Sequence, residues 1–83
     1  MAQINQYVVR GYKRIEYVKR SNGQQVNGYE VYLESVEPEE TVFGDQLEAV
    51  YLSGKYSQFV PALGVCVRKV YNQYGRVEDL IEI

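Results

Sequence analysis

Basic and aromatic side chains gather near the start of the chain, and their types suit binding rather than catalysis. They are Arg10, Tyr12, Arg14, Lys19, Arg20 and Tyr29. Arg10, Tyr12 and Arg14 are two residues apart, so in a β-strand they are expected to share one face. Such surfaces bind single-stranded nucleic acids, because cations neutralise phosphates while exposed aromatic rings stack on bases. A β domain with nine tyrosines also places some rings beside arginines without any such role, so both interpretations stay open.

Residue types that most catalytic and metal sites need are missing. The chain has no histidine and one cysteine, Cys66, which excludes a histidine-based triad and leaves too few ligands for zinc. Cys66 lies between two valines and is expected to be a small buried side chain. Glu37, Glu39 and Glu40 lack EF-hand spacing, so a solvated acidic loop is expected. We therefore predict no enzyme, no bound metal and no cofactor.

Charge is unevenly divided along the chain. Residues 1–29 carry five basic side chains and one acidic one, whereas residues 30–48 carry seven acidic side chains and no basic one. The net charge of −2 therefore hides a dipolar molecule, in which local potentials matter more than the total. The acidic stretch 30–48 is a candidate surface for a basic host protein.

Alternating apolar and polar residues predict five strands, at about 6–20, 24–36, 47–53, 63–72 and 76–83. Asn22-Gly23 predicts a hairpin turn between the first two strands, and Tyr74-Gly75 predicts the last turn. Gly11 predicts a bend or bulge in the first strand, and Asn27-Gly28 predicts a bulge in the second.

The predicted fold class is all-β, a single domain over residues 1–83. The best interpretation is a small five-stranded OB-like barrel with protruding hairpins, because closure removes exposed strand edges. The alternative is a five-stranded roll with one short helix at 43–50. We expect Val9, Ile15 and Tyr17 on one face of the first strand, and Val31 and Leu33 toward the core from the second.

The expected location is the cytoplasm. No apolar run is long enough to span a membrane, and residues 1–6 lack the basic and apolar regions of a signal peptide. A single cysteine excludes an intramolecular disulfide, which fits a reducing compartment.

Three segments resemble the single-stranded DNA-binding proteins of filamentous phages, the helix-destabilising proteins that coat the replicated viral strand. They are the basic hairpin at 17–29, the segment Phe59-Val60-Pro61-Ala62-Leu63 leading into Val65-Cys66-Val67, and the turn Asn72-Gln73-Tyr74-Gly75. The resemblance implies that Tyr29 and Tyr74 stack on bases and that Lys19 and Arg20 are cations of the first hairpin. It also implies a homodimer, which a small core independently favours.

Three functions are compatible with these observations. The leading hypothesis is a homodimeric single-stranded nucleic acid binder of phage or mobile-element type, acting on DNA or RNA. The second is a small interaction or inhibitor module that acts through residues 30–48. The third is a structural or oligomeric module stabilised by pairing of strand edges.

Overall fold

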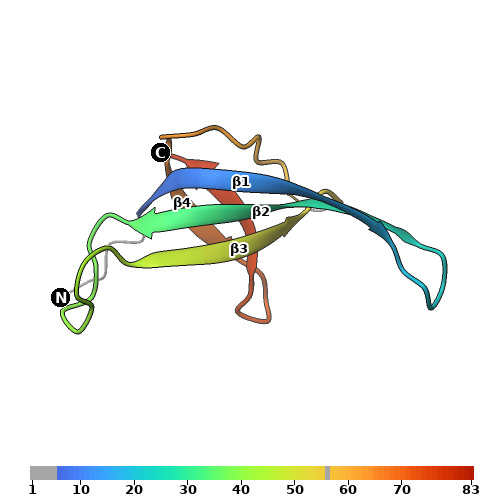
Figure 1. Cartoon of the computed structure of the whole chain (residues 1–83), viewed down its shortest axis with the longest axis horizontal. Helices are drawn as coiled ribbons and strands as arrows, with labels where there is room; N and C mark the ends of the chain where they lie inside the picture. Colours follow the sequence, from blue (N-terminus) through green and yellow to red (C-terminus); the bar gives the residue numbers. More distant parts are fainter. Residues whose placement is uncertain (1–5, 56) are drawn as a thin grey trace.

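The computed structural model describes residues 6–55 and 57–83, which form one sheet of five antiparallel strands (Figure 1). The strands are β1 (Tyr7–Val18), β2 (Gln25–Ser35), β3 (Leu47–Ser53), β4 (Cys66–Tyr71) and β5 (Val77–Glu82). The all-β prediction is confirmed. Residues 1–5, on which the prediction about a signal peptide depends, lie outside the described residues.

The alternative fold with a helix at 43–50 is wrong, because the described residues form no helix and β3 begins at Leu47. In β3, Glu48, Val50 and Leu52 all pair with inward-facing residues of β2, and this period of two belongs to a strand. Among the described residues there is no helix with the length and apolar character that a membrane span requires.

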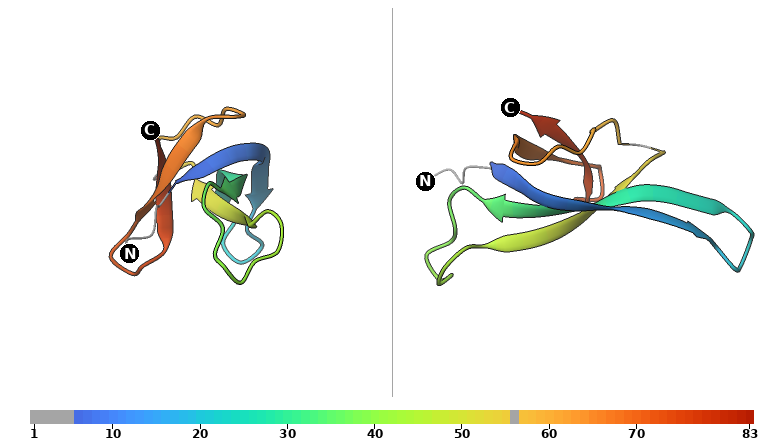
Figure 2. Two further views of the ribbon diagram at one scale, coloured as in Figure 1. Left: turned by 90° about the vertical axis from the view of Figure 1, so that its left-hand side faces the viewer. Right: turned by 45° about the horizontal axis from the view of Figure 1, so that its top comes forward.

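The strand order is β3-β2-β1-β4-β5, which is the order around an OB-like barrel opened between β3 and β5. No ladder joins β3 to β5 within residues 6–55 and 57–83. The sheet coils strongly, so that β4 and β5 cross over β1–β3 at a steep angle (Figures 1 and 2). The fold therefore has two layers made from a single sheet.

The core lies between these layers and is built from alternate residues of every strand. Its buried side chains are Val9, Val31, Leu33, Val50, Leu52, Val67 and Leu80. As predicted, β2 directs Val31 and Leu33 into the core. Cys66 was expected to be buried but is exposed, because its neighbour Val67 takes the inward position and alternation turns Cys66 outward.

A bulge in β1 decides which side chains share a face. The β1–β2 ladder shifts by one residue between Val9 and Gly11 and skips Arg10, so the bulge predicted at Gly11 is confirmed. Past the bulge, the faces of the strand exchange. Tyr12 now pairs with the inward-facing Val31, so it lies on the inner face, as Val9 does before the bulge.

The exchange overturns two expectations about β1. Ile15 and Tyr17 were expected on the face of Val9, but they lie on the outer face, which points away from the core. Arg10 was expected to share a face with Tyr12 and Arg14. It instead reaches the outer face, where its guanidinium binds the carboxylate of Glu34 at 2.8 Å. A one-residue shift moves every later side chain to the other face.

A carboxylate fixes the crossover between β3 and β4. Asp79 of β5 accepts hydrogen bonds from the Ser57 hydroxyl (2.6 Å) and from the backbone N–H groups of Gln58 (3.2 Å) and Leu80 (2.8 Å). Partial burial alone would raise the pKa of Asp79, but these hydrogen bonds outweigh it and lower the pKa from its ordinary value. The crossover is thereby held where Phe59 packs against the core.

An ion pair links the two layers on the side where β3 and β5 are unpaired. Lys69 of β4 points inward, binds Glu48 of β3, and lies 4.4 Å from the ring centroid of Tyr7. Burial alone would lower the pKa of Lys69, but the contacts with Glu48 and Tyr7 outweigh it and raise the pKa. This pair therefore connects β3 to β4 without a backbone ladder.

Candidate nucleic-acid interface

A groove runs across the C-terminal end of β3, between the β1–β2 hairpin and the β4–β5 hairpin. It consists of two adjoining cavities of about 700 and 530 Å³, which share Tyr51 and Ser53 as lining residues. These volumes are in the range of small-molecule sites. The aromatic side chains that line it include Tyr17, Tyr51, Tyr71 and Tyr74, and the cationic side chains include Lys19 and Lys55. We call it the tyrosine groove.

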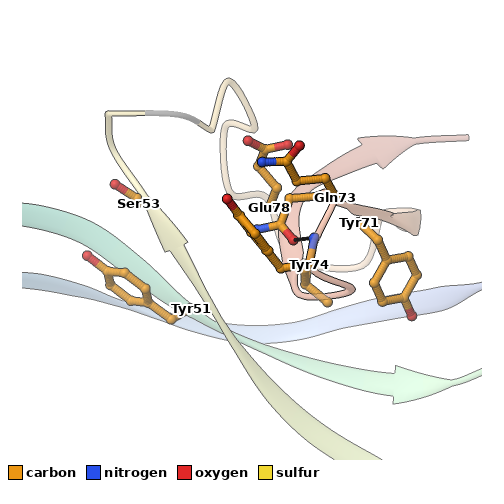
Figure 3. Close-up of a pocket in the computed structure, with 8 residues that line it drawn as sticks. Tyr51, Ser53, Tyr71, Gln73, Tyr74 and Glu78 are labelled. Carbon is orange, nitrogen blue, oxygen red and sulfur yellow. Dashed lines mark hydrogen bonds between the residues drawn. The ribbon is translucent and has the colours of Figure 1, made fainter.

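Figure 3 shows the larger cavity, with Tyr51 and Ser53 on β3 and the remaining side chains on the β4–β5 hairpin. The ring of Tyr74 stands edge-on between Tyr51 and Tyr71 in this view. The hairpin at Tyr74 and the strand at Tyr51 are far apart in the sequence, so only the coiling of the sheet brings them to the same groove.

Tyr51 occupies its position because a glycine lies beneath it. A Cβ at Gly28 of β2 would lie 2.4 Å from the backbone oxygen of Leu52 and 2.8 Å from the Tyr51 hydroxyl oxygen. Only glycine leaves room for Tyr51 to lie over β2. The bulge predicted at Asn27-Gly28 is wrong, because the ladders through Gly28 are regular and the glycine serves this close approach instead.

The turn between β4 and β5 presents Tyr74 to solvent, with 79% of the residue exposed. The side-chain oxygen of Asn72 accepts the backbone N–H groups of Tyr74 (2.9 Å) and Arg76 (3.1 Å). Gly75 adopts φ +78°, a conformation that costs other residues energy. The turn predicted at Tyr74-Gly75 is confirmed, and Asn72 is the side chain that holds it.

The β1–β2 hairpin closes in the same manner. The side-chain oxygen of Asn22 accepts the backbone N–H of Gln24 at 2.9 Å, and Gly23 adopts φ +69°. The backbone N–H of Lys19 donates to the Gln24 carbonyl at 2.8 Å, so the predicted Asn22-Gly23 hairpin is confirmed. Lys19 lines the groove near this turn, and Arg20 is exposed within the loop.

Of the seven binding residues predicted from the sequence, the structure places Lys19 and Tyr74 in the tyrosine groove. Tyr12 and Tyr29 form an edge-to-face pair, with ring centroids 6.2 Å apart, on the inner face of the β1–β2 hairpin. Arg14 lies on that face too and binds Glu16 at 2.6 Å. These inner-face residues therefore point away from the groove.

Sequence reasoning missed Tyr17, Tyr51, Tyr71 and Lys55. Tyr51 could have been found, because it alternates with Val50 and Leu52 and must point outward when they point inward. Tyr17 could not, because the bulge at Arg10 reversed the face on which it was expected.

The structure divides the acidic stretch 30–48 into separate parts. Glu34 binds Arg10 on the outer face, and the half-exposed Glu48 binds Lys69 between the two layers. Four further acidic side chains lie in the loop 36–46 between β2 and β3. That loop is at one end of the long axis of the molecule and the tip of the β1–β2 hairpin is at the other (Figures 1 and 2). The acidic loop therefore lies apart from the groove cations.

The described part of the chain holds no group of three cysteine, aspartate or glutamate side chains that could bind a metal ion. The fold and the groove define a small, OB-like β-sheet protein with an aromatic surface between two hairpins. Comparison with protein-family models, with curated proteins and with solved structures found no match to this chain.

Proposed function

We propose that the protein binds single-stranded nucleic acid, most readily DNA, in the tyrosine groove. The observation that carries this proposal is that Tyr51 on β3 and Tyr74 on the β4–β5 hairpin line one cavity, and that Tyr51 also lines the adjoining cavity with Lys19 of the other hairpin. In OB-folds, oligonucleotides bind across the β2–β3 face and the loops that follow β1 and β4. The tyrosine groove occupies the corresponding place.

The rings and cations have separate roles in this proposal. Tyr51 and Tyr74 stack on successive bases, while Lys19 and Arg20 neutralise phosphates along the backbone. Stacking requires a free base plane, and the bases of a duplex are already stacked and paired. The groove should therefore prefer a single strand to a duplex of the same sequence.

The resemblance to the filamentous-phage proteins supports the same activity through Lys19, Arg20 and Tyr74. It extends the proposal to a cytoplasmic homodimer that coats a replicating strand. It does not extend to Tyr29 as a groove residue, because that ring packs against the core and against Tyr12.

The test is a titration of fluorescent single-stranded DNA of about 20 nucleotides, and of the matching duplex, at low and moderate salt. We expect the single strand to bind more tightly and the affinity to fall as salt rises. Tyr51→Ala and Tyr74→Ala should each weaken binding about 5- to 150-fold, which corresponds to 1–3 kcal/mol per stacked base.

Tyr32→Ala is the matched control. Tyr32 is 38% exposed and Tyr51 is 44% exposed, and each covers a glycine on the neighbouring strand. Only Tyr51 lines the groove, so Tyr32→Ala should leave affinity within about twofold of wild type. Equal losses for the two variants, or no binding of single-stranded DNA at low salt, would exclude the proposed site.

A further inference from the structure

The β2–β3 loop, residues 36–46, carries a feature that nucleic acid binding does not explain. Phe43 in this loop is 99% exposed, so its ring packs against none of the residues 6–55 and 57–83 that the structure describes. Four acidic side chains surround it in the sequence, Glu37, Glu39, Glu40 and Asp45. Aromatic side chains contribute strongly to the energetics of interfaces, so an exposed ring of this size is available for a contact with another molecule.

The loop holds Phe43 outward by hydrogen bonds that do not involve its ring. The backbone N–H of Glu39 donates to the side-chain oxygen of Gln46 (2.8 Å), and the N–H of Val42 donates to the Glu39 carbonyl (3.0 Å). Gly44 follows with φ +85°. The ring is therefore presented by a folded loop.

The tyrosine groove offers the complementary chemistry. Its larger part has aromatic walls at Tyr51 and Tyr74 and a carboxylate, that of Glu78. Its other part contains Lys19 and Lys55. A ring flanked by carboxylates resembles a base flanked by phosphates, because each offers such a surface an aromatic plane beside negative charge. The groove can therefore accept the Phe43 loop through the contacts proposed for nucleic acid.

The loop lies apart from the groove of its own chain in this structure. It joins β3 at Leu47, whereas the groove crosses β3 at Tyr51 and Ser53. A strand of this length separates its ends by about 20 Å. The loop lies beyond the end of β3 that begins at Leu47 (Figure 1). With the loop in this position, a contact between the two joins different copies of the chain.

We propose that the 36–46 loop of one copy docks in the tyrosine groove of a second copy. Phe43 enters between Tyr51 and Tyr74, and the carboxylates face the lysine end of the groove. The two surfaces differ, so the contact is heterologous, and repeating it produces a head-to-tail chain. Nucleic acid and the loop then compete for one groove. This competition rests on the proposed function, but the contact between the loop and the groove does not.

Two complementary variants test the contact by sedimentation in the absence of DNA. Phe43→Ala removes the inserted ring and Tyr74→Ala removes a groove wall, and both residues are so exposed that the fold should survive. At low salt the wild type should form larger species than it forms at high salt. Neither variant alone should form these larger species. Mixed together, the variants should restore the contact, because Phe43→Ala supplies an intact groove and Tyr74→Ala supplies an intact loop.

Val60→Ala is the control, because Val60 is also well exposed and apolar but belongs to neither surface. It should assemble as the wild type does. Assembly of Phe43→Ala at the wild-type level, or a wild type that never exceeds its high-salt mass, would overturn the docking proposal.

Adding the fluorescent single strand separates this inference from the proposed function. Disassembly of the wild type by the oligonucleotide, with severalfold tighter DNA binding by Phe43→Ala, would support competition. Assembly that the oligonucleotide neither binds nor disrupts would refute nucleic acid binding while leaving the contact intact. DNA binding without any assembly would refute the contact alone.

Discussion

Replacing Lys69 by methionine should show how strongly the ion pair between Lys69 and Glu48 holds the two layers of the sheet together. The pair with Glu48 connects β3, which carries Tyr51, to β4, which leads into the hairpin of Tyr74. Methionine keeps most of the apolar length of the lysine stem but removes the charge. We expect both lower stability and weaker DNA binding, since the groove depends on how β3 and the β4–β5 hairpin are placed.

The magnitude follows from the exposure of the two partners. The Lys69 side chain is 9% exposed and that of Glu48 is 37% exposed, so the remaining carboxylate can be hydrated after the substitution. The loss should therefore lie between that of a surface pair and the 3–5 kcal/mol of a fully buried one, at about 2 kcal/mol. In a domain of this size that lowers Tm by roughly 8–16 °C.

Urea and thermal unfolding measure this loss, with Glu48→Gln and the double variant completing a mutant cycle. The raised pKa of Lys69 means that the folded state holds its proton more tightly than the unfolded state does. The stabilisation is therefore present at neutral pH and is lost as pH rises above the ordinary value of 10.5. The quantity to measure is therefore the difference between wild type and Lys69→Met. If Tm changed by less than about 2 °C and that difference did not depend on pH, the pair would not link the layers.

Three further substitutions test single contacts. Asn72→Ala should lower the free energy of unfolding, measured in urea, by about 1–2 kcal/mol and weaken DNA binding severalfold. The reason is that the turn that presents Tyr74 loses two hydrogen bonds. Unchanged affinity would show that the turn does not need these hydrogen bonds. Gly28→Ala should destabilise the fold by about 1–3 kcal/mol, since the added Cβ meets the Leu52 carbonyl oxygen, and a neutral result in the same assay would contradict that geometry. Because hydrogen bonds lower the pKa of Asp79, its contribution to stability is present above the ordinary pKa of 3.8 and is lost as pH falls through the lowered one; Asp79→Asn should remove this part of the acid dependence of the urea midpoint, and an identical pH profile would refute the role of the carboxylate.

Much of the fold could be predicted from the sequence. The alternation of apolar and polar residues located all five strands, because a strand that packs on one side repeats every two residues. The two hairpin turns could also be predicted, because Gly23 and Gly75 adopt positive φ angles that other residues adopt at a cost. Both signals are local, since each depends on residues only a few positions apart.

The candidate site depended on contacts that are not local. The skipped residue in β1 put Tyr17 on the outer face and Tyr12 on the inner one, against the expected alternation, so Tyr12 does not share a face with Arg10. The close packing of Tyr51 on Gly28 belongs to two strands, and nothing in either strand alone indicates it.

The sequence by itself therefore determined the class of fold, the strands and the turns, and two of its candidate binding residues, Lys19 and Tyr74, lie in one groove. The tertiary structure decided that Tyr51 and Tyr17 join them, and that the acidic loop lies apart from the groove. The physical reason is that side-chain direction along a strand follows from local geometry. The meeting of β3 with two hairpins requires the whole sheet to coil around a shared core.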